Sequence, residues 1–168
     1  SVIRIHPEET AAVAARMLTH YNIGALPVCD HDGQLKGLIT DRDIVTRCLA
    51  TGRQPEQTRI REVMTDHVVS AAPDMDVHLA ASLMGHRQVR RLPVLENQRL
   101  CGMISLGDLA VRDETAYDAG DALAEISNNL SILGIRTASP GVNRQDGVVL
   151  IVFFGKQRLD AHLFAAFL

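Results

Sequence analysis

The sequence predicts an α/β (α+β) fold: two pseudo-symmetric β-α-β-β-α units packed sheet to sheet, followed by a C-terminal extension. Three observations predict this fold class. Small and apolar residues recur at helical spacing after Pro7 and again after Pro73. Each of these stretches leads into a Leu-Pro-Val strand, and each unit ends on Gly-apolar-apolar-Thr/Ser-x-x-Asp. One unit of this size has a marginal core, so two copies are expected to bury their sheets against each other.

The first unit, residues 1–58, is predicted to contain two helices and a hairpin. Thr10 is the expected N-cap of the first helix, and Asn22 to Gly24 form its expected exit. The turn Asp30–Gly33 separates the two hairpin strands. In order, the predicted elements are an opening strand, a helix over 11–21, strands over 25–29 and 34–39, and a helix over 41–50.

The second unit, residues 59–127, repeats this order. The offset between the units is 66 positions at the prolines and 65 positions from Gly37 to Gly102. A hairpin turn that is one residue shorter, Glu96–Gln98, accounts for the difference. The predicted elements are a helix over 77–86, strands over 89–95 and 100–104, and a last helix that starts at 107–112 and closes the unit by 127.

A hydroxyl residue and an aspartate occupy the strand-to-helix junction of each unit. They are Thr40 and Asp43 in the first unit, and Ser105 and Asp108 in the second. A hydroxyl and the first N–H groups of a helix can face phosphate, and a carboxylate can accept hydrogen bonds from sugar hydroxyls. The alternative is ordinary helix capping, which explains either junction when it is taken singly. The repetition favours a ligand site.

The net charge and the absence of several known motifs argue against some classes of function. The net charge of −3 and the absence of aromatic residues among the arginines near the second Leu-Pro-Val strand argue against a nucleic-acid or membrane surface. The histidines lack metal-ligand spacing, and no P-loop, GxGxxG or nucleophile elbow is present, so we expect neither a metal site nor an enzyme. Cys29, Cys48 and Cys101 are predicted to be reduced core thiols of a cytoplasmic protein.

The ordered set of motifs occurs twice, with a Val-Met-Thr linker between the copies, and it resembles a tandem pair of CBS domains, also called a Bateman module. The resemblance covers residues 1 to about 127 and is strongest to small stand-alone prokaryotic CBS proteins. It implies a regulatory module that senses an adenine nucleotide, AMP or ATP, in the cleft between the repeats. It also implies a homodimer associated through its helices, an unidentified regulated protein, and no covalently bound cofactor.

The resemblance also implies roles for particular residues. Asp43 and Asp108 would hold ribose hydroxyls, and Thr40 and Ser105 would meet phosphate. Arg91 falls where family members often place a phosphate-binding basic residue, whereas the first unit has no charge at that place. The full set of candidate ligand-binding residues is Thr40, Arg42, Asp43, Arg91, Ser105, Asp108, Ile5, Val69, Ala71 and Arg90, with Ile3 and Val68 as further apolar candidates beside the adenine. For the apolar members the alternative is a place in the core.

Two other interpretations stay open. A structural module could dimerise without a ligand, and it would be distinguished by a cleft filled with side chains. A small nucleotide-processing enzyme is the other, although no sequence feature supports it. Residues 128–168 do not resemble the family, and we expect them to form an extension without a functional site; they could instead pack on the module or on a partner subunit.

Overall fold

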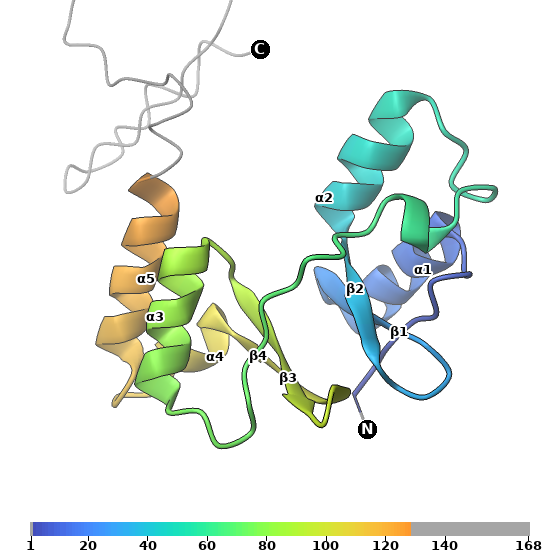
Figure 1. The fold of residues 1–168 in the computed structure, drawn as a ribbon. Coiled ribbons are helices and arrows are strands. Elements are labelled where there is room, and N and C mark those ends of the chain that lie inside the picture. Colours follow the sequence, from blue (N-terminus) through green and yellow to red (C-terminus); the bar gives the residue numbers. More distant parts are fainter. Residues whose placement is uncertain (1, 129–168) are drawn as a thin grey trace, which may run out of the picture. The chain divides into compact units, whose positions relative to one another are not determined.

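The structure is a computed structural model, and it describes residues 2–128. The predicted extension over 128–168 therefore lies, except for its first residue, outside the described part. The first unit contains α1 (Ala11–Tyr21), β1 (Ala25–Cys29), β2 (Leu35–Thr40), α2 (Asp41–Asp43), a π-helical turn η1 (Ile44–Cys48) and a 3₁₀ turn η2 (Leu49–Thr51). A further 3₁₀ turn, η3 (Ile60–Glu62), follows in the segment that joins the units, and Ile60 packs in the first core. The second unit contains α3 (Val77–Arg87), β3 (Arg91–Glu96), β4 (Arg99–Ser105), α4 (Leu106–Ala110) and α5 (Ala116–Asn128) (Figure 1).

Local capping sets the helix boundaries as the sequence predicts. The Thr10 hydroxyl accepts a hydrogen bond from the Val13 amide, and Asn22 ends α1 in the left-handed conformation with φ of 51°. In α3 the Asp76 carboxylate caps the start, and Gln88 takes the left-handed position at the end. The predicted helix over 41–50 forms, but its pitch changes from α to π to 3₁₀ along its length.

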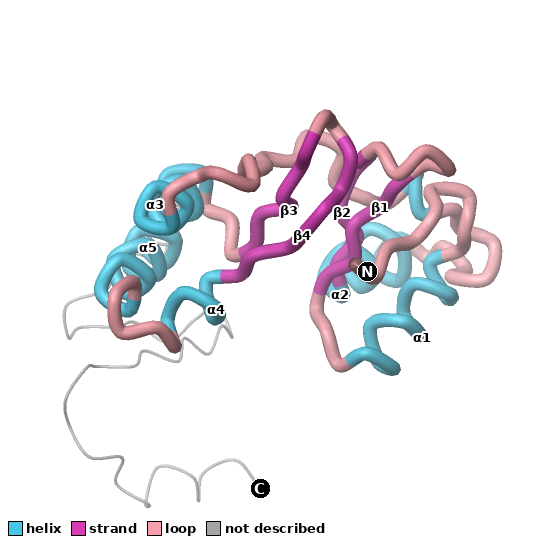
Figure 2. Tube along the Cα trace, turned by 90° about the horizontal axis from the view of Figure 1, so that it is seen from below, coloured by secondary structure: helices cyan, strands magenta, loops and turns pink. Residues whose placement is uncertain are grey.

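Each unit has an antiparallel two-stranded sheet, β1 with β2 and β3 with β4 (Figure 2). The predicted opening strands are wrong as strands: each is reduced to a single parallel bridge, Ile5 with Val28 and Ala71 with Val94. The linker supplies further pairing in the first unit, since Leu38 and Thr65 exchange two backbone hydrogen bonds of 2.9 Å. Between the units, the Leu100 amide donates to the Gly33 carbonyl at 3.1 Å.

Two separate apolar cores match the two units. Leu26, Val28 and Ile39 are fully buried in the first core. Met84 and Leu92 are fully buried in the second. Each sheet therefore packs against the helices of its own unit, and in the first unit every residue of β1 is buried.

Helix α5 closes the second unit by packing along α3, and the two helices lie side by side in both views (Figures 1 and 2). A Cβ at Gly85 would meet the Glu125 carboxylate and would lie 3.3 Å from Ala122 Cα, so glycine permits this close approach. At the other end, His78 Nδ1 lies 2.8 Å from Asp118 Oδ2, and that hydrogen bond raises the pKa of His78.

The three cysteines differ in burial. Cys29 and Cys48 are buried as predicted, but the prediction that Cys101 is a core thiol is wrong. Leu100 turns into the core from β4, so its neighbour Cys101 faces outward. No helix within residues 2–128 is both long enough and apolar enough to cross a membrane.

The contact between β2 and the linker generates a stability prediction. A Cβ at Gly37 would lie 2.6 Å from the Thr65 carbonyl oxygen and 2.8 Å from Met64 Sδ. Because the carbonyl belongs to the backbone, Gly37→Ala is expected to lower the free energy of unfolding by about 1–3 kcal/mol in urea denaturation. Gly120→Ala in α5 is the control, since nothing lies within 4 Å of its Cβ position and alanine favours a helix. Equal effects of the two substitutions would contradict this account.

Candidate functional site

The register of the second sheet assembles one corner of the candidate site. Arg91 at the start of β3 pairs with Ser105 at the end of β4, and α4 begins at the next residue. The Asp108 carboxylate then folds back: its Oδ2 accepts hydrogen bonds from the Ser105 amide at 2.8 Å and the Ser105 hydroxyl at 2.6 Å. The Asp108 amide donates to that hydroxyl at 3.2 Å, which completes a reciprocal capping box.

The first junction has the same hydrogen bonds in a different environment. Asp43 Oδ2 accepts from the Thr40 amide at 3.0 Å and from the Thr40 hydroxyl at 2.7 Å. Asp43 is only 8% exposed, and its Oδ1 lies 3.5 Å from Arg47 Nε. Arg47 Nη1 also donates to the Val63 and Met64 carbonyls at 3.2 and 2.9 Å. The Asp43 carboxylate is therefore paired with Arg47, which also forms hydrogen bonds to the linker.

Asp108 differs from Asp43 in both burial and charge pairing. It is exposed, and in the part of the chain that the structure describes its carboxylate forms no ion pair. Arg112 follows Asp108 by four residues, as Arg47 follows Asp43, but α4 ends at Ala110 and Arg112 lies beyond the helix. Asp108 Oδ1 consequently remains available to accept hydrogen bonds from a ligand.

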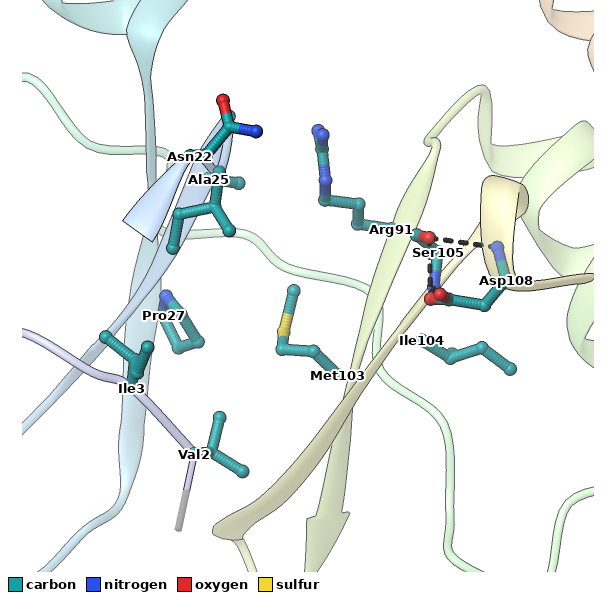
Figure 3. A pocket seen from close by; sticks show the side chains of 12 residues that line it. Val2, Ile3, Asn22, Ala25, Pro27, Arg91, Met103, Ile104, Ser105 and Asp108 are labelled. Atoms are coloured by element: carbon teal, nitrogen blue, oxygen red, sulfur yellow. Dashed lines mark hydrogen bonds between the residues drawn. The ribbon is translucent and has the colours of Figure 1, made fainter. Parts of the chain in front are cut away.

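A cavity of about 460 Å³ opens beside the Ser105–Asp108 corner, and both units line it (Figure 3). This size is within the usual range for small-molecule sites. The first unit contributes Val2, Ile3, Asn22, Ile23, Gly24, Ala25 and Pro27, and the second contributes Arg91, Met103, Ile104, Ser105 and Asp108. One end of the cavity is apolar and the other carries a guanidinium, a hydroxyl and a carboxylate.

Arg91 extends toward the first unit. Its Nη2 would lie 3.1 Å from a Cβ at Gly24, so the missing side chain at that position leaves room for the guanidinium. Figure 3 shows the Arg91 side chain between Asn22 and Ser105. No side-chain hydrogen bond or ion pair joins Arg91 to the other described residues. A half-buried guanidinium with free donors is suited to a phosphate or carboxylate group.

The structure brings together Arg91, Ser105, Asp108 and Ile3 from the predicted set. Thr40, Arg42 and Asp43 do not line this cavity. The remaining residues also lie elsewhere: Ile5 and Ala71 are buried in the two cores, Val69 packs against the second core, Val68 lines a separate hollow near Asp66, and Arg90 lines a neighbouring hollow.

Sequence reasoning missed most of the apolar wall of the cavity. Ile3, an apolar candidate in the sequence, lines the cavity that contains the second unit's carboxylate, but Pro27 and Met103 beside it are not in the predicted set. Strand alternation could have indicated Met103 and Pro27, because each lies two residues from a lining residue, Ser105 and Ala25 respectively. The Ser105 hydroxyl also has less freedom than predicted, since its only proton is donated to Asp108.

Comparison with known proteins places the chain in a family. The profile of the CBS domain matches residues 1–50 and 60–114. The chain therefore belongs to the CBS domain family and is a tandem pair of CBS domains. CBS domain-containing protein YhcV of Bacillus subtilis is 42% identical over 127 residues, which cover 76% of this chain and 89% of that protein.

Two solved structures share the fold. The CBS domain pair of protein MJ0100, in complex with 5′-methylthioadenosine and S-adenosyl-L-methionine, is 31% identical. The match covers 66% of this chain and 86% of that one, with a TM-score of 0.60. CBS domain protein PAE2072 of Pyrobaculum aerophilum, complexed with AMP, is 19% identical, with coverages of 71% and 92% and a TM-score of 0.64.

The different burial of the two carboxylates predicts unequal structural roles. Asp43→Ala should lower the free energy of unfolding by about 1–3 kcal/mol, because it removes a buried cap and leaves Arg47 unpaired. Asp108→Ala should cost about 1 kcal/mol or less, because its cap is exposed to water. Urea denaturation measures both. An equal or larger loss for Asp108→Ala would show that the second carboxylate is also structural.

Proposed function

We propose that this CBS pair is a regulatory module that binds an adenine nucleotide, AMP or ATP, in the cavity at Arg91, Ser105 and Asp108. The observation that carries the proposal is the cavity itself: it is open, both repeats line it, and it combines an unpaired guanidinium with an available carboxylate oxygen. A module that only dimerises would fill this cleft with side chains.

The chemistry of the cavity supports a role for each group. Asp108 Oδ1 accepts hydrogen bonds from ribose hydroxyls, while Asp108 Oδ2 keeps its bonds to Ser105. Arg91 binds the phosphate through its two-pronged N–H donors. The adenine ring lies against the apolar wall formed by Ile3, Pro27 and Met103. The adenosine compounds bound by the CBS pair of MJ0100, which is 31% identical, favour the same ligand class here.

The proposal assigns one nucleotide to each chain. The Asp43 carboxylate is buried and paired with Arg47, and freeing it would release the linker carbonyls of Val63 and Met64. The Thr40–Asp43 junction is therefore a structural copy of the ligand corner. Its hydrogen bonds orient α2 and do not serve the nucleotide.

Regulation follows from the position of the cavity between the repeats. A ligand that contacts Ile3 in the first repeat and Asp108 in the second favours the arrangement in which both are within reach. A regulated protein, still unidentified, would read that arrangement.

We also include a homodimer in the proposal. Helical segments of the two repeats carry exposed apolar side chains, among them Val45, Leu49, Leu79 and Leu123. Their burial between two chains would remove apolar surface from water. Light scattering should give twice the 18.3 kDa mass of one chain. The mass of a single chain would rule the dimer out.

Titration calorimetry with AMP tests the nucleotide site. We expect saturable binding of one AMP per chain. Arg91→Ala and Asp108→Ala should each weaken binding by about tenfold or more, because each removes a charge-assisted hydrogen bond. S-adenosylmethionine and ATP are titrated in parallel to define the ligand class.

Two exposed residues of the second repeat provide matched controls. Arg87→Ala and Asp74→Ala remove the same charges as the site variants, but neither residue lines the cavity. Both should leave AMP affinity unchanged. If folded protein binds no adenosine compound, the proposed function is wrong. If binding survives both site variants, the site is misplaced.

A further inference from the structure

A second charged residue, Asp41, lies close to Gly24, which lines the cavity beside Arg91, although Asp41 itself does not line the cavity. Asp41, the first residue of α2, places its Oδ2 3.6 Å from the Cβ position of Gly24, and Arg91 Nη2 lies 3.1 Å from the same point. Both groups lie near Gly24 and form no ion pair with each other. Because each lies within 4 Å of the same point, they are closer together than the screening length at physiological salt, so each charge affects an ion bound beside the other.

The local charge is suited to a small anion. Arg91 is the one cation among the described residues that line the cavity, and Asp108 already supplies a negative charge to it. One guanidinium fork binds one phosphate group in bidentate geometry. A second and third phosphate would extend past Arg91 and add negative charge close to the Asp41 carboxylate.

We propose that this cavity discriminates among adenine nucleotides by phosphate number, and that Asp41 of the first repeat disfavours di- and triphosphates relative to the monophosphate. The inference rests on the proposed nucleotide site. It adds a residue that determines specificity. This residue belongs to the first repeat, whereas Ser105 and Asp108 belong to the second. Gly24 is part of the same site, because a Cβ there would lie 3.1 Å from Arg91 Nη2 and would crowd the guanidinium.

The structure also offers a second path for the phosphate chain of ATP, which would favour ATP over AMP. Arg90 lines a neighbouring hollow of about 470 Å³ that shares Arg91 and Ser105 with the cavity. A longer phosphate chain directed into that hollow would gain a second cation and would avoid Asp41. In that case ATP would bind at least as tightly as AMP, and Arg90→Ala would weaken ATP selectively.

Calorimetry with AMP, ADP and ATP in magnesium-free buffer tests the proposal. We expect AMP to bind most tightly and ATP to bind about tenfold or more weakly. Asp41→Asn should improve ATP affinity by about three- to tenfold and change AMP affinity by less than about twofold, because the repulsion grows with ligand charge. Added salt should reduce the difference between wild type and variant.

Asp113→Asn is the matched control. Asp113 is exposed, it does not line the cavity, and its replacement changes the net charge of the chain by the same single unit. It should leave the AMP to ATP ratio unchanged. ATP binding equal to or tighter than AMP, or a ratio that Asp41→Asn does not alter, overturns the proposal while the nucleotide site stands. Failure of every adenosine compound to bind overturns the nucleotide site itself.

Discussion

The reciprocal hydroxyl–carboxylate capping box at the end of each hairpin is the interaction on which this structure depends. It satisfies backbone donors at the start of the helix and fixes the direction in which the chain leaves the sheet. It also holds the aspartate in one rotamer, with one carboxylate oxygen committed to the cap and the other directed away from it. A feature that folds the junction thereby also prepares a hydrogen-bond acceptor for a ligand.

The two repeats use this junction differently because the following helices differ in length. In the first repeat helical structure continues from α2 through η1, so Arg47 stays one turn from Asp43 and its guanidinium reaches the linker. In the second repeat α4 ends at Ala110, before the corresponding Arg112. One carboxylate is consequently buried and paired while the other is exposed at the cavity. We propose that the first corner is structural and that the second binds the ligand.

Local signals in the sequence predict much of this fold and only part of the site. The bounds of α1 follow from Thr10 and Asn22, whose side-chain and backbone preferences act within one turn of the helix. Ser105 and Asp108 could be predicted as candidates because they belong to a repeated motif, and Arg91 because it precedes Leu-Pro-Val, where family members often place a basic residue. Ile3 and Ser105 line one cavity, and Asp41 and Arg91 both lie near Gly24, only because of how the two repeats pack. No short-range sequence pattern predicts that packing. The opening strands are wrong for another reason: each forms only a single bridge.

The central claim is that the Asp108 corner binds a nucleotide and the Asp43 corner does not. A crystal structure of the protein grown with AMP tests this claim most directly. We predict one AMP per chain, with its ribose hydroxyls on Asp108, its phosphate on Arg91, and the Asp43–Arg47 pair intact. A nucleotide bound at Asp43, with the Asp108 corner empty, would contradict the account.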